Sequence, residues 1–454
     1  MAVITNDFKR MALRKIYDDA QDVTNRYYVG IGKSEPWNDT ETVPTPIGSI
    51  RDDRLARQGL QAIKSASNLS FVVSRYNWTS GTIYNAWDDN DLTVGDNPYY
   101  IITEDNRVYM CVQEARNASG TQTGSTVKPT HIDPLKAVKT ADGYKWKYLY
   151  TVLSTNASAF LSSNFLPVRL ADSTETGAGA EQYAVQDAAV RGQILGVKVI
   201  NGGAGYSSAP TVTITGNGTG ATATAYVTGG VVTHIFLDSS ADSAMAMGRG
   251  YDFAGVTLSG GSPTTAASAR AVIGDIYGAG LGADPRNDLR STSLMFNAKP
   301  DGIETNTFFV GGQDFRQVIL IQDPVDSNGS AITSTVANAS KYLLADDAAE
   351  AGGFALDTTI TGGTSGAKAR YVSNAADKIY IVQNDSTGYN AFTTGETVSG
   401  NAAGGGTQNA TLLSGRLNYE NVYQPNGKIL YIDNRAAVVR DSGQTEDIKV
   451  VITI

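Results

Sequence analysis

The chain opens with a helical pattern of apolar residues. They recur three or four positions apart after Thr5 and Asn6, either of which can cap a helix. The apolar positions are Phe8, Met11, Ala12, Ile16, Ala20 and Val23. This spacing predicts an amphipathic helix with one face to bury, and a second helix is predicted over 51–65.

Beyond the first helix the pattern changes to short runs of β-forming residues. Residues 26–32 form the first run, and a loop broken by Pro36 ends it. Further strands are predicted at 69–76, 99–102, 107–113 and 145–153. The connections between them are rich in Asp, Asn and Gly, so this part of the chain is predicted to be an α+β region.

A two-copy repeat follows in a segment rich in Gly, Ala, Thr, Ser and Val. Each copy has a Gly-Tyr pair, a short strand ending in Gly and an Ala-rich strand. The first copy has these elements at 205–206, 212–216 and 221–227, and the second has them at 250–251, 256–260 and 267–272. Two copies are fewer than a solenoid needs, so the pattern predicts a compact β-sandwich or barrel made of two similar halves.

A shorter echo lies near the C-terminus. The strands at 360–362 and 367–372 resemble those at 398–400 and 410–413, and a further strand is predicted at 378–382. We therefore predict a multidomain protein of the α+β, mostly β class, in which two small all-β modules are inserted into an α+β body. The predicted segments are 1–190 (N-terminal body), 191–275 (two-copy module), 276–340 (continuation of the body), 341–415 (second module) and 416–454 (C-terminal strands returning to the body).

Composition narrows the class of partners. The formal net charge of −9 opposes a role that depends on neutralising many phosphates, so nucleic acid is not expected as a partner. No stretch is long and apolar enough for a membrane span, and no apolar segment follows the N-terminal charges as in a secretory signal. We expect a protein that folds in a cytoplasm. Cys111 is the single cysteine, which excludes an internal disulfide, and its neighbours predict a buried strand.

Residues suited to catalysis or metal binding are few. His131 and His234 each stand alone in the sequence, which favours hydrogen-bonded or surface roles over catalysis. The acidic run 88–91 lacks the glutamate and glycine placement of a calcium loop, which predicts a solvated turn. The glycines of 216–220 lack the Lys-Ser/Thr of a phosphate loop and predict a hairpin turn. No cofactor, metal, small-molecule substrate or catalytic residue is predicted.

Two other functions remain open on the residues alone. A polysaccharide hydrolase needs only two carboxylates about 5 to 10 Å apart, and a chain with 45 acidic residues offers many pairs. A carbohydrate- or receptor-binding module is the main alternative, because Tyr206 or Tyr251 could stack on a sugar. Their matching positions in the repeat favour a shared packing role over two sugar sites.

Several motifs outside the repeats resemble a known family. The most specific is Gly32-Lys33-Ser34-Glu35-Pro36-Trp37, and the second is the strand entry from Asp142 to Leu149, Asp-Gly-Tyr-Lys-Trp-Lys-Tyr-Leu. Looser matches are Gly282-Ala283-Asp284-Pro285, Asp314-Phe315-Arg316-Gln317, Asp323-Pro324, Asn434-Arg435 and the run 444–448. Together they resemble the dimeric baseplate wedge subunit of T-even-type contractile-tailed phages (myoviruses), in a larger form known from marine phages. The two repeat modules depart from the shorter members of that family.

The resemblance implies a structural virion protein without enzymatic activity, assembled in the host cytoplasm. It implies a homodimer in the tail baseplate that binds other wedge proteins and tail-fibre-associated proteins, and that supports baseplate assembly and the triggering of sheath contraction. The candidate packing or interface residues are Gly32, Ser34, Glu35, Pro36, Trp37, Gly143, Tyr144, Trp146, Tyr148, Asp284, Pro285, Phe315 and Arg316. Aromatic side chains are prominent both in cores and in subunit interfaces, so both settings are considered for the tryptophans. Core packing is favoured over direct intersubunit contact.

Overall fold

The computed structural model describes the chain in eight stretches. They are residues 2–22, 24–38, 40–91, 97–237, 247–274, 280–299, 313–439 and 447–454. The protein is mostly β with several sheets, which confirms the predicted multidomain α+β class. It divides into two compact units: Met1–Arg10 with Ser70–Ser293 (unit 1), and Met11–Leu69 with Leu294–Ile454 (unit 2). The five predicted segment boundaries stay predictions.

The first helix, α1, spans Asn6–Gln21, as the apolar pattern predicts. Its most buried residues are Leu13 and Ala20, whereas Phe8 and Met11 are 52% and 62% exposed. The predicted helix is therefore confirmed, and Ala20 of the predicted stripe is buried, but Leu13, the most buried residue, lies outside the stripe. Val23 lies outside the described residues.

Unit 1 contains a four-stranded antiparallel sheet in the order β4-β5-β7-β6. Its strands are β4 (Tyr100–Ile102), β5 (Arg107–Gln113), β6 (Val138–Lys139) and β7 (Lys145–Thr151). Helix α4 (Ala178–Asp187) packs on β7. A second strand pair joins β3 (Asn68–Ser74) to β8 (Phe165–Val168), and α3 (Ser154–Phe160) lies against β8. The sequence placed β3, β4, β5 and β7 correctly because their β-forming residues and bounding turns are visible in it.

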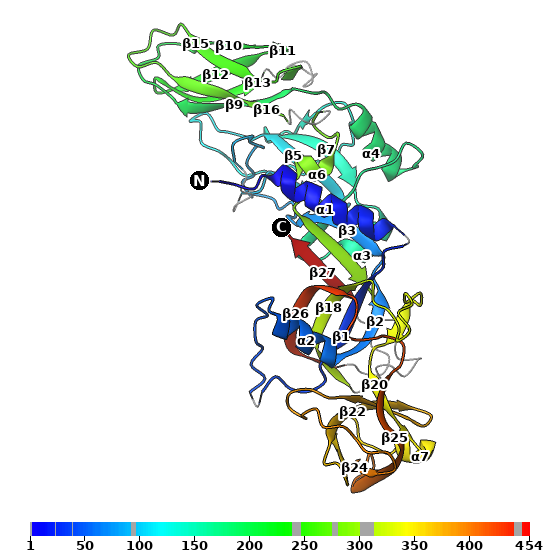
Figure 1. Cartoon of the computed structure of the whole chain (residues 1–454). Coiled ribbons are helices and arrows are strands. Elements are labelled where there is room, and N and C mark those ends of the chain that lie inside the picture. Colours follow the sequence, from blue (N-terminus) through cyan, green and yellow to red (C-terminus); the bar gives the residue numbers. More distant parts are fainter. Residues whose placement is uncertain are drawn as a thin grey trace. The chain divides into compact units, whose positions relative to one another are not determined.

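The two-copy repeat forms a six-stranded sheet in the order β15-β10-β12-β13-β9-β16, drawn in green in Figure 1. Its strands are β9 (Ile194–Asn201), β10 (Thr211–Gly216), β12 (Ala223–Thr228), β13 (Val231–Leu237), β15 (Ala254–Ser259) and β16 (Ser268–Ile273). A separate short ribbon pairs β11 (Thr219–Ala221) with β14 (Met247–Arg249). We call residues 194–273 the first β-module.

The pairing within the first β-module relates its two halves by a local twofold. Thr213 of β10 pairs with Thr257 of β15, and these residues hold the same position in the two copies. The last strand of each half also pairs with the first strand of the other, since β12 pairs with β13 and β16 pairs with β9. The repeat in the sequence therefore appears in the structure as a pseudo-symmetric pair of three-stranded halves.

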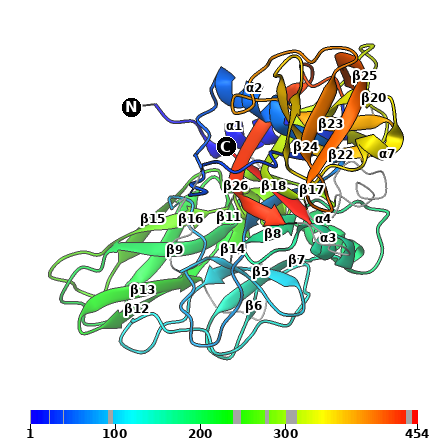
Figure 2. The same cartoon turned by 90° about the horizontal axis from the view of Figure 1, so that it is seen from below.

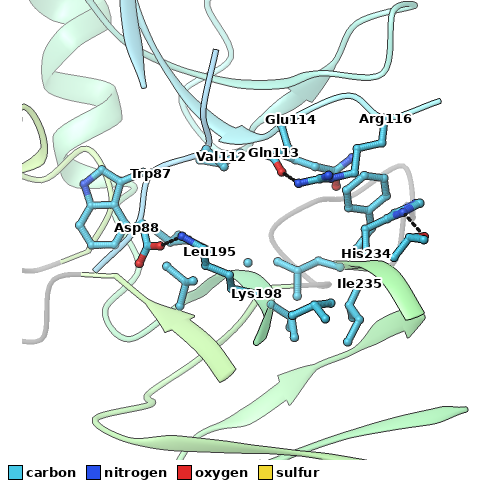
Figure 3. Close-up of a pocket in the computed structure, with 18 residues that line it drawn as sticks. Trp87, Asp88, Val112, Gln113, Glu114, Arg116, Leu195, Lys198, His234 and Ile235 are labelled. Carbon is cyan, nitrogen blue, oxygen red and sulfur yellow. Dashed lines mark hydrogen bonds and ion pairs between the residues drawn. The ribbon is translucent and has the colours of Figure 1, made fainter. Parts of the chain in front are cut away.

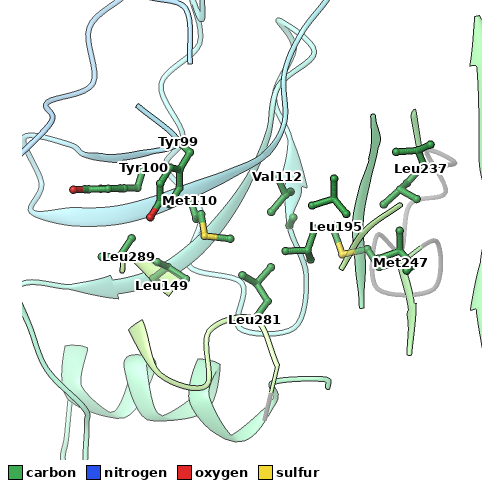
Figure 4. Close-up of a cluster of buried hydrophobic side chains, with 14 of the residues drawn as sticks. Tyr99, Tyr100, Met110, Val112, Leu149, Leu195, Leu237, Met247, Leu281 and Leu289 are labelled. Atoms are coloured by element: carbon green, nitrogen blue, oxygen red, sulfur yellow. The ribbon is translucent and has the colours of Figure 1, made fainter. Parts of the chain in front are cut away.

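A continuous apolar core runs through unit 1. In Figure 4, Tyr100, Met110 and Leu149 from the four-stranded sheet lie on one side, and Leu195 and Leu237 from the first β-module on the other. All five are buried. The first β-module and the four-stranded sheet therefore share one core, which explains why they belong to the same compact unit.

Unit 2 contains a five-stranded antiparallel sheet in the order β19-β2-β1-β18-β26. Its strands are β1 (Tyr27–Gly32), β2 (Leu60–Ser65), β18 (Asp314–Gln322), β19 (Val336–Asn338) and β26 (Lys428–Val439). Strands β17 (Ser293–Ala298) and β27 (Ile448–Thr453) are neighbours in another sheet.

The second predicted helix is shorter than expected. Helix α2 spans Ile50–Gly59 behind a capping box of Ser49 and Asp52, and the chain then continues as β2. The prediction of helix through residue 65 was wrong, because the start of β2 is buried on both faces and its apolar run does not distinguish a strand from a buried helix.

The C-terminal echo forms a closed six-stranded barrel, the second β-module, in the order β20-β23-β22-β21-β24-β25. Figure 2 shows most of its strands together with helix α7 (Ala348–Ala351). The strands are β20 (Lys341–Ala345), β21 (Thr359–Gly362), β22 (Lys368–Ala375), β23 (Lys378–Val382), β24 (Thr397–Asn401) and β25 (Thr407–Tyr419). Thr361 pairs with Ser399, again at equivalent positions of the two copies.

Both β-modules have the same topology. If β9, β10, β12, β13, β15 and β16 are taken in turn as β20 to β25, the two strand orders become identical. Each internal repeat is visible in the sequence, but the fold that the two modules share was not predicted from it. The shared signal is short: a strand ending in Gly, followed by a strand segment that begins with Ala, occurs four times.

Candidate assembly site

The most specific motif, 32–37, begins at the end of β1, where the backbone of Gly32 lies close to that of Gly59. A side chain at Gly32 would place its Cβ 2.2 Å from the carbonyl oxygen of Gly59, so only glycine fits there. Lys33 then takes a left-handed conformation with φ 61°, and its backbone N–H donates to the Gly59 carbonyl at 2.9 Å. The loop therefore starts from a fixed point on the sheet of unit 2.

Ser34 and Glu35 connect this loop to the second β-module. The Ser34 hydroxyl accepts a hydrogen bond from Arg370 Nε of β22 at 3.1 Å. Glu35 Oε1 accepts from Asn384 Nδ2 at 2.6 Å and forms an ion pair with Lys33 at 2.8 Å. These contacts join β1 to the barrel across more than 330 residues of sequence, so the motif acts as a structural junction within unit 2.

Arg316 supports the same loop from β18. Its guanidinium donates to the Ser34 carbonyl at 2.6 Å and to Glu41 Oε1 at 2.9 Å, and it pairs with Asp314 at 3.2 Å. The hydrogen bond from Arg316 lowers the pKa of Glu41. Arg316 and its neighbour Phe315 are both buried. The donors of Arg316 are therefore used to hold the loop that follows β1.

Pro36 and Trp37 lie at the outer side of this junction. Pro36 is exposed and Trp37 is half-buried. The indole N–H of Trp37 donates to the Arg435 carbonyl of β26 at 2.9 Å, and the Lys33 ammonium lies 4.4 Å from the centre of the indole ring. Trp37 is thus held in one orientation with part of its ring accessible to solvent. This setting is intermediate between the two considered from the sequence, core packing and direct intersubunit contact.

Several of the looser family matches meet at this site. Gln317 Nε2 donates to Asn434 Oδ1 at 2.7 Å, next to the Arg435 carbonyl that binds Trp37. Asp323, at the far end of β18, accepts from the Arg26 backbone at 2.8 Å. Residues 444–446 of the last match lie outside the described residues. The segments 32–37, 314–317 and 434–435 form one contact network, which we call the assembly site.

The second motif, 142–149, forms the aromatic core of the four-stranded sheet in unit 1. Asp142 accepts from the backbone N–H groups of Thr126 and Val127 at 2.8 and 2.9 Å. Its pKa is lowered, since these and other hydrogen bonds outweigh the opposing effect of burial. Gly143 follows with φ 97° and allows the chain to turn into β7.

The aromatic residues of β7 are fully buried. Tyr144 stacks on Trp146 with ring centres 5.6 Å apart, and the Tyr148 hydroxyl lies 2.8 Å from that of Thr151. Tyr144, which precedes β7, and Trp146, Tyr148 and Tyr150 within it are all buried, so Trp146 packs in the core. Burial also lowers the pKa of Lys147 to about 8, and its ammonium donates to the Pro134 carbonyl at 2.7 Å.

Asp284 and Pro285 start a single helical turn, α6 (Pro285–Asp288). The Asp284 carboxylate caps it by accepting from the Arg286 backbone N–H at 3.0 Å and pairs with the Arg286 guanidinium at 2.8 Å. The preceding Gly282 lies near the Lys147 side chain, since a Cβ on it would be 3.7 Å from Lys147 Cε. Both motifs of unit 1 are therefore packed together in its interior.

The remaining candidates for chemistry have structural surroundings. Cys111 is buried in β5 as predicted, and burial raises the pKa of its thiol. His131 packs edge-on against Tyr109, and burial lowers its pKa to about 4, so its ring is neutral at pH 7. In the part of the chain that the structure describes, no group of three His, Cys, Asp or Glu side chains could hold a metal ion.

The expected solvated turn at 88–91 was wrong for Asp88. This carboxylate is only 8% exposed and binds Lys198 at 2.6 Å and Arg270 of the first β-module. The role of Asp88 was not predicted from the sequence because both of its partners lie more than 100 positions away in the chain. Arg370 and Asn384, the partners of Ser34 and Glu35, were also not predicted, and nothing in their local sequence marks them as junction residues.

The tyrosines proposed for sugar stacking are both buried. Tyr206 is 6% exposed and Tyr251 is 2% exposed. Their hydroxyls accept backbone hydrogen bonds from Ala267 at 2.8 Å and from Ala221 at 3.4 Å, so each tyrosine binds the other half of the module. Neither ring is available to stack on a ligand. Both tyrosines instead have the packing role that their matching positions in the repeat favoured.

Comparison with known proteins adds no relative. No protein-family model and no curated protein matches the chain. Among the helices within the described residues, none combines the length and apolar character required to cross a bilayer.

Proposed function

We propose that this chain is a structural subunit of a phage tail baseplate wedge, in which it forms a homodimer and binds other wedge proteins. One observation carries the proposal. Three segments that each resemble the wedge family, 32–37, 314–317 and 434–435, come together in the assembly site, where Arg316 binds Ser34 and Arg435 binds Trp37. Independent chance matches have no reason to be neighbours across some 400 residues, which supports a common structural origin for these motifs.

The assembly site is suited to holding parts together. Its strongest polar groups are already committed, since Arg316 binds a carbonyl and two carboxylates and Glu35 binds Lys33 and Asn384. A buried arginine with several fixed acceptors gives a rigid platform. In this proposal the site catalyses no reaction, and its role is to present a rigid surface to a neighbouring subunit.

The accessible part of the site is its proposed contact with a neighbouring subunit. Pro36 has a restricted backbone, and Trp37 is oriented by its hydrogen bond to Arg435, so little conformational entropy is lost when a partner covers them. Tryptophan is also among the residues that contribute most to binding energy in protein interfaces. We expect this pair to lie in a contact within the baseplate, assembled in the host cytoplasm.

The test compares Trp37→Ala with Tyr423→Ala, a partly exposed aromatic residue of the same unit. Sedimentation of the purified chain, alone and with the other wedge proteins, should show a homodimer that joins the wedge. Trp37→Ala should weaken one of these associations at least tenfold, because interface hot spots contribute about 2 kcal/mol or more. The control variant should associate normally. A strictly monomeric chain that joins no wedge protein would contradict the proposal.

A further inference from the structure

A cavity of about 200 Å³ lies in unit 1, between the first β-module and the end of β5. Figure 3 shows Asp88 and Lys198 on one side of it, and Glu114, Arg116 and His234 on the other. Apolar side chains of β9 and β13, including Leu195 and Ile235, form its floor. The cavity does not overlap the assembly site, so a role for it does not depend on the proposed function.

The charges on the cavity wall cancel. Glu114 pairs with Arg116, and Asp88 pairs with Lys198 at 2.6 Å and with Arg270. Arg270 also pairs with Asp89, and neither of these two residues lines the cavity, so the charged side chains of the lining are the acids Asp88 and Glu114 and the bases Lys198 and Arg116. Burial and the nearby Arg116 lower the pKa of His234, which leaves its ring neutral at pH 7. A ligand with a net charge therefore finds no opposite charge to neutralise.

The same wall offers many oriented donors and acceptors. The Glu114 carboxylate accepts, the Arg116 guanidinium donates, and the Thr233 hydroxyl lies 3.0 Å from His234 Nδ1. A hydroxyl group is both donor and acceptor, so it can bridge a carboxylate and a guanidinium that already face each other. The apolar floor requires in addition a ligand with an apolar face.

An aromatic platform continues from the cavity. His234 stacks on Tyr226 with ring centres 4.5 Å apart and an interplanar angle of 9°, and Phe236 lies 4.6 Å from His234. Tyr226 is 45% exposed, so its ring extends the platform into solvent. Rings at such an edge can pack against the C–H face of a second ring of the ligand.

We propose that this cavity binds one neutral sugar ring of a glycan chain. A pyranose combines several hydroxyl groups with an apolar face and has no charge, which matches the wall, the floor and the charge balance. The volume is below the roughly 300 Å³ at which sites for drug-sized ligands begin, so a single ring occupies the cavity and a neighbouring ring reaches Tyr226. This site is distinct from the buried Tyr206 and Tyr251.

The structure supplies a sharp test at Gly196 of β9. Gly196 lines the cavity, and a Cβ built on it meets no atom within 4 Å, so a side chain there fills the cavity without a backbone clash. Gly255 is the matched control: it is an exposed glycine of β15 in the same sheet, and its Cβ would make only an ordinary contact, 3.5 Å from Thr215. Both changes place leucine in a strand of the first β-module.

The experiment uses saturation-transfer NMR and calorimetry on the full chain. The probes are methyl pyranosides of glucose, galactose, mannose and N-acetylglucosamine, with methyl glucuronide as a charged probe. We expect at least one neutral pyranoside to bind with a millimolar Kd, Gly196→Leu to weaken it at least tenfold, and Gly255→Leu to leave it unchanged. Thermal unfolding should show both variants folded.

Three results would overturn the proposal. They are the absence of binding by every neutral probe at concentrations well above millimolar, binding that survives Gly196→Leu, and tighter binding of the glucuronide than of its neutral counterpart. Each is a direct consequence of the cavity's position or charge balance. None bears on whether the chain joins a baseplate, so this inference and the proposed function fail separately.

Discussion

The two β-modules have one topology but close it in different ways. In the second, backbone ladders join β21 to β22 and β24 to β25, and the barrel is complete. In the first, β10 and β12 share a single paired position, Thr211 with Thr224, and the structure gives no ladder between β15 and β16 in the described residues. The first module is therefore a looser version of the second.

Aromatic residues at one equivalent position show what replaces the missing ladders. Tyr206 and Tyr251 precede the Gly-ending strands of the first module, and Phe354 and Phe392 precede those of the second by a similar number of residues. All four rings are buried. Only the tyrosines have a hydroxyl, and it binds a backbone N–H at or near the poorly paired strands. The ring thus packs the core in both modules, and the hydroxyl compensates for lost pairing in one.

The largest predicted effect tests the shared role of the ring. Tyr206→Ala and Phe354→Ala should each destabilise the protein by about 3 to 5 kcal/mol, since both remove a buried ring from a packed core. Denaturant unfolding measures this, with Tyr226→Ala as an exposed control expected to cost far less. A small effect at one site and a large effect at the other would show that the ring does not have the same packing role in the two modules.

A smaller effect is expected where the first module is fastened to the rest of unit 1. Asp88→Asn should cost about 2 to 3 kcal/mol at pH 7, because it leaves Lys198 and Arg270 without their buried partner, and both cations retain some solvent. The pKa of Asp88 is well below its ordinary value through its hydrogen bonds to Lys198, Asn90 and Arg270, which outweigh burial.

This lowered pKa gives the effect a pH dependence. A carboxyl group with a folded-state pKa below the unfolded value of about 3.9 stabilises the fold above that value, and the stabilisation disappears as the pH falls towards the folded pKa. The difference in unfolding free energy between wild type and Asp88→Asn should therefore be full at pH 7 and shrink below about pH 4. A difference independent of pH would show that the carboxylate charge is not the cause.

The hydroxyls give the next effect. Tyr206→Phe should cost about 1 kcal/mol, the usual net contribution of one hydrogen bond, and Tyr251→Phe should cost less because its bond is longer, 3.4 Å against 2.8 Å. Hydrogen exchange of the Ala267 and Ala221 amides would locate the loss. Equal protection of both amides in wild type and variants would contradict the compensating role of the hydroxyls.

The smallest effect has the opposite sign and lies in the second module. Burial raises the pKa of Asp357, partly opposed by Arg370. A raised pKa means that this carboxyl group favours the fold at low pH and opposes it once ionised. Asp357→Asn should therefore stabilise the protein slightly at pH 7 and lose this advantage at acid pH, and asparagine tolerates the left-handed φ of 60° at this position. A destabilised variant at pH 7 would contradict this.

The fold was predictable where the pattern is local. The strand 107–113 was placed correctly, as was the Ala-rich strand of each repeat, because their residue types and bounding turns are visible in the sequence. The helix predicted through 65 failed because β2 is buried on both faces. The shared topology of the modules was not predicted, because it depends on which strands pair and not on where they start.

The candidate site was predictable in its residues but not in its partners. Ser34, Trp37 and Arg316 were singled out from motifs, yet no sequence signal indicated that Arg316 contacts Ser34 or that Trp37 contacts Arg435. Asp88 and Arg370 were missed as junction residues because each acts through partners far away in the chain. Long-range polar contacts of this kind leave no periodicity to read.

The most direct test of the proposed assembly role is a cryo-electron microscopy map of purified particles that resolves the tail tip. We expect paired copies of this chain inside the baseplate ring, with Pro36 and Trp37 covered by a neighbouring subunit. A tail tip that lacks the chain, or in which this pair faces open solvent in every copy, would contradict it.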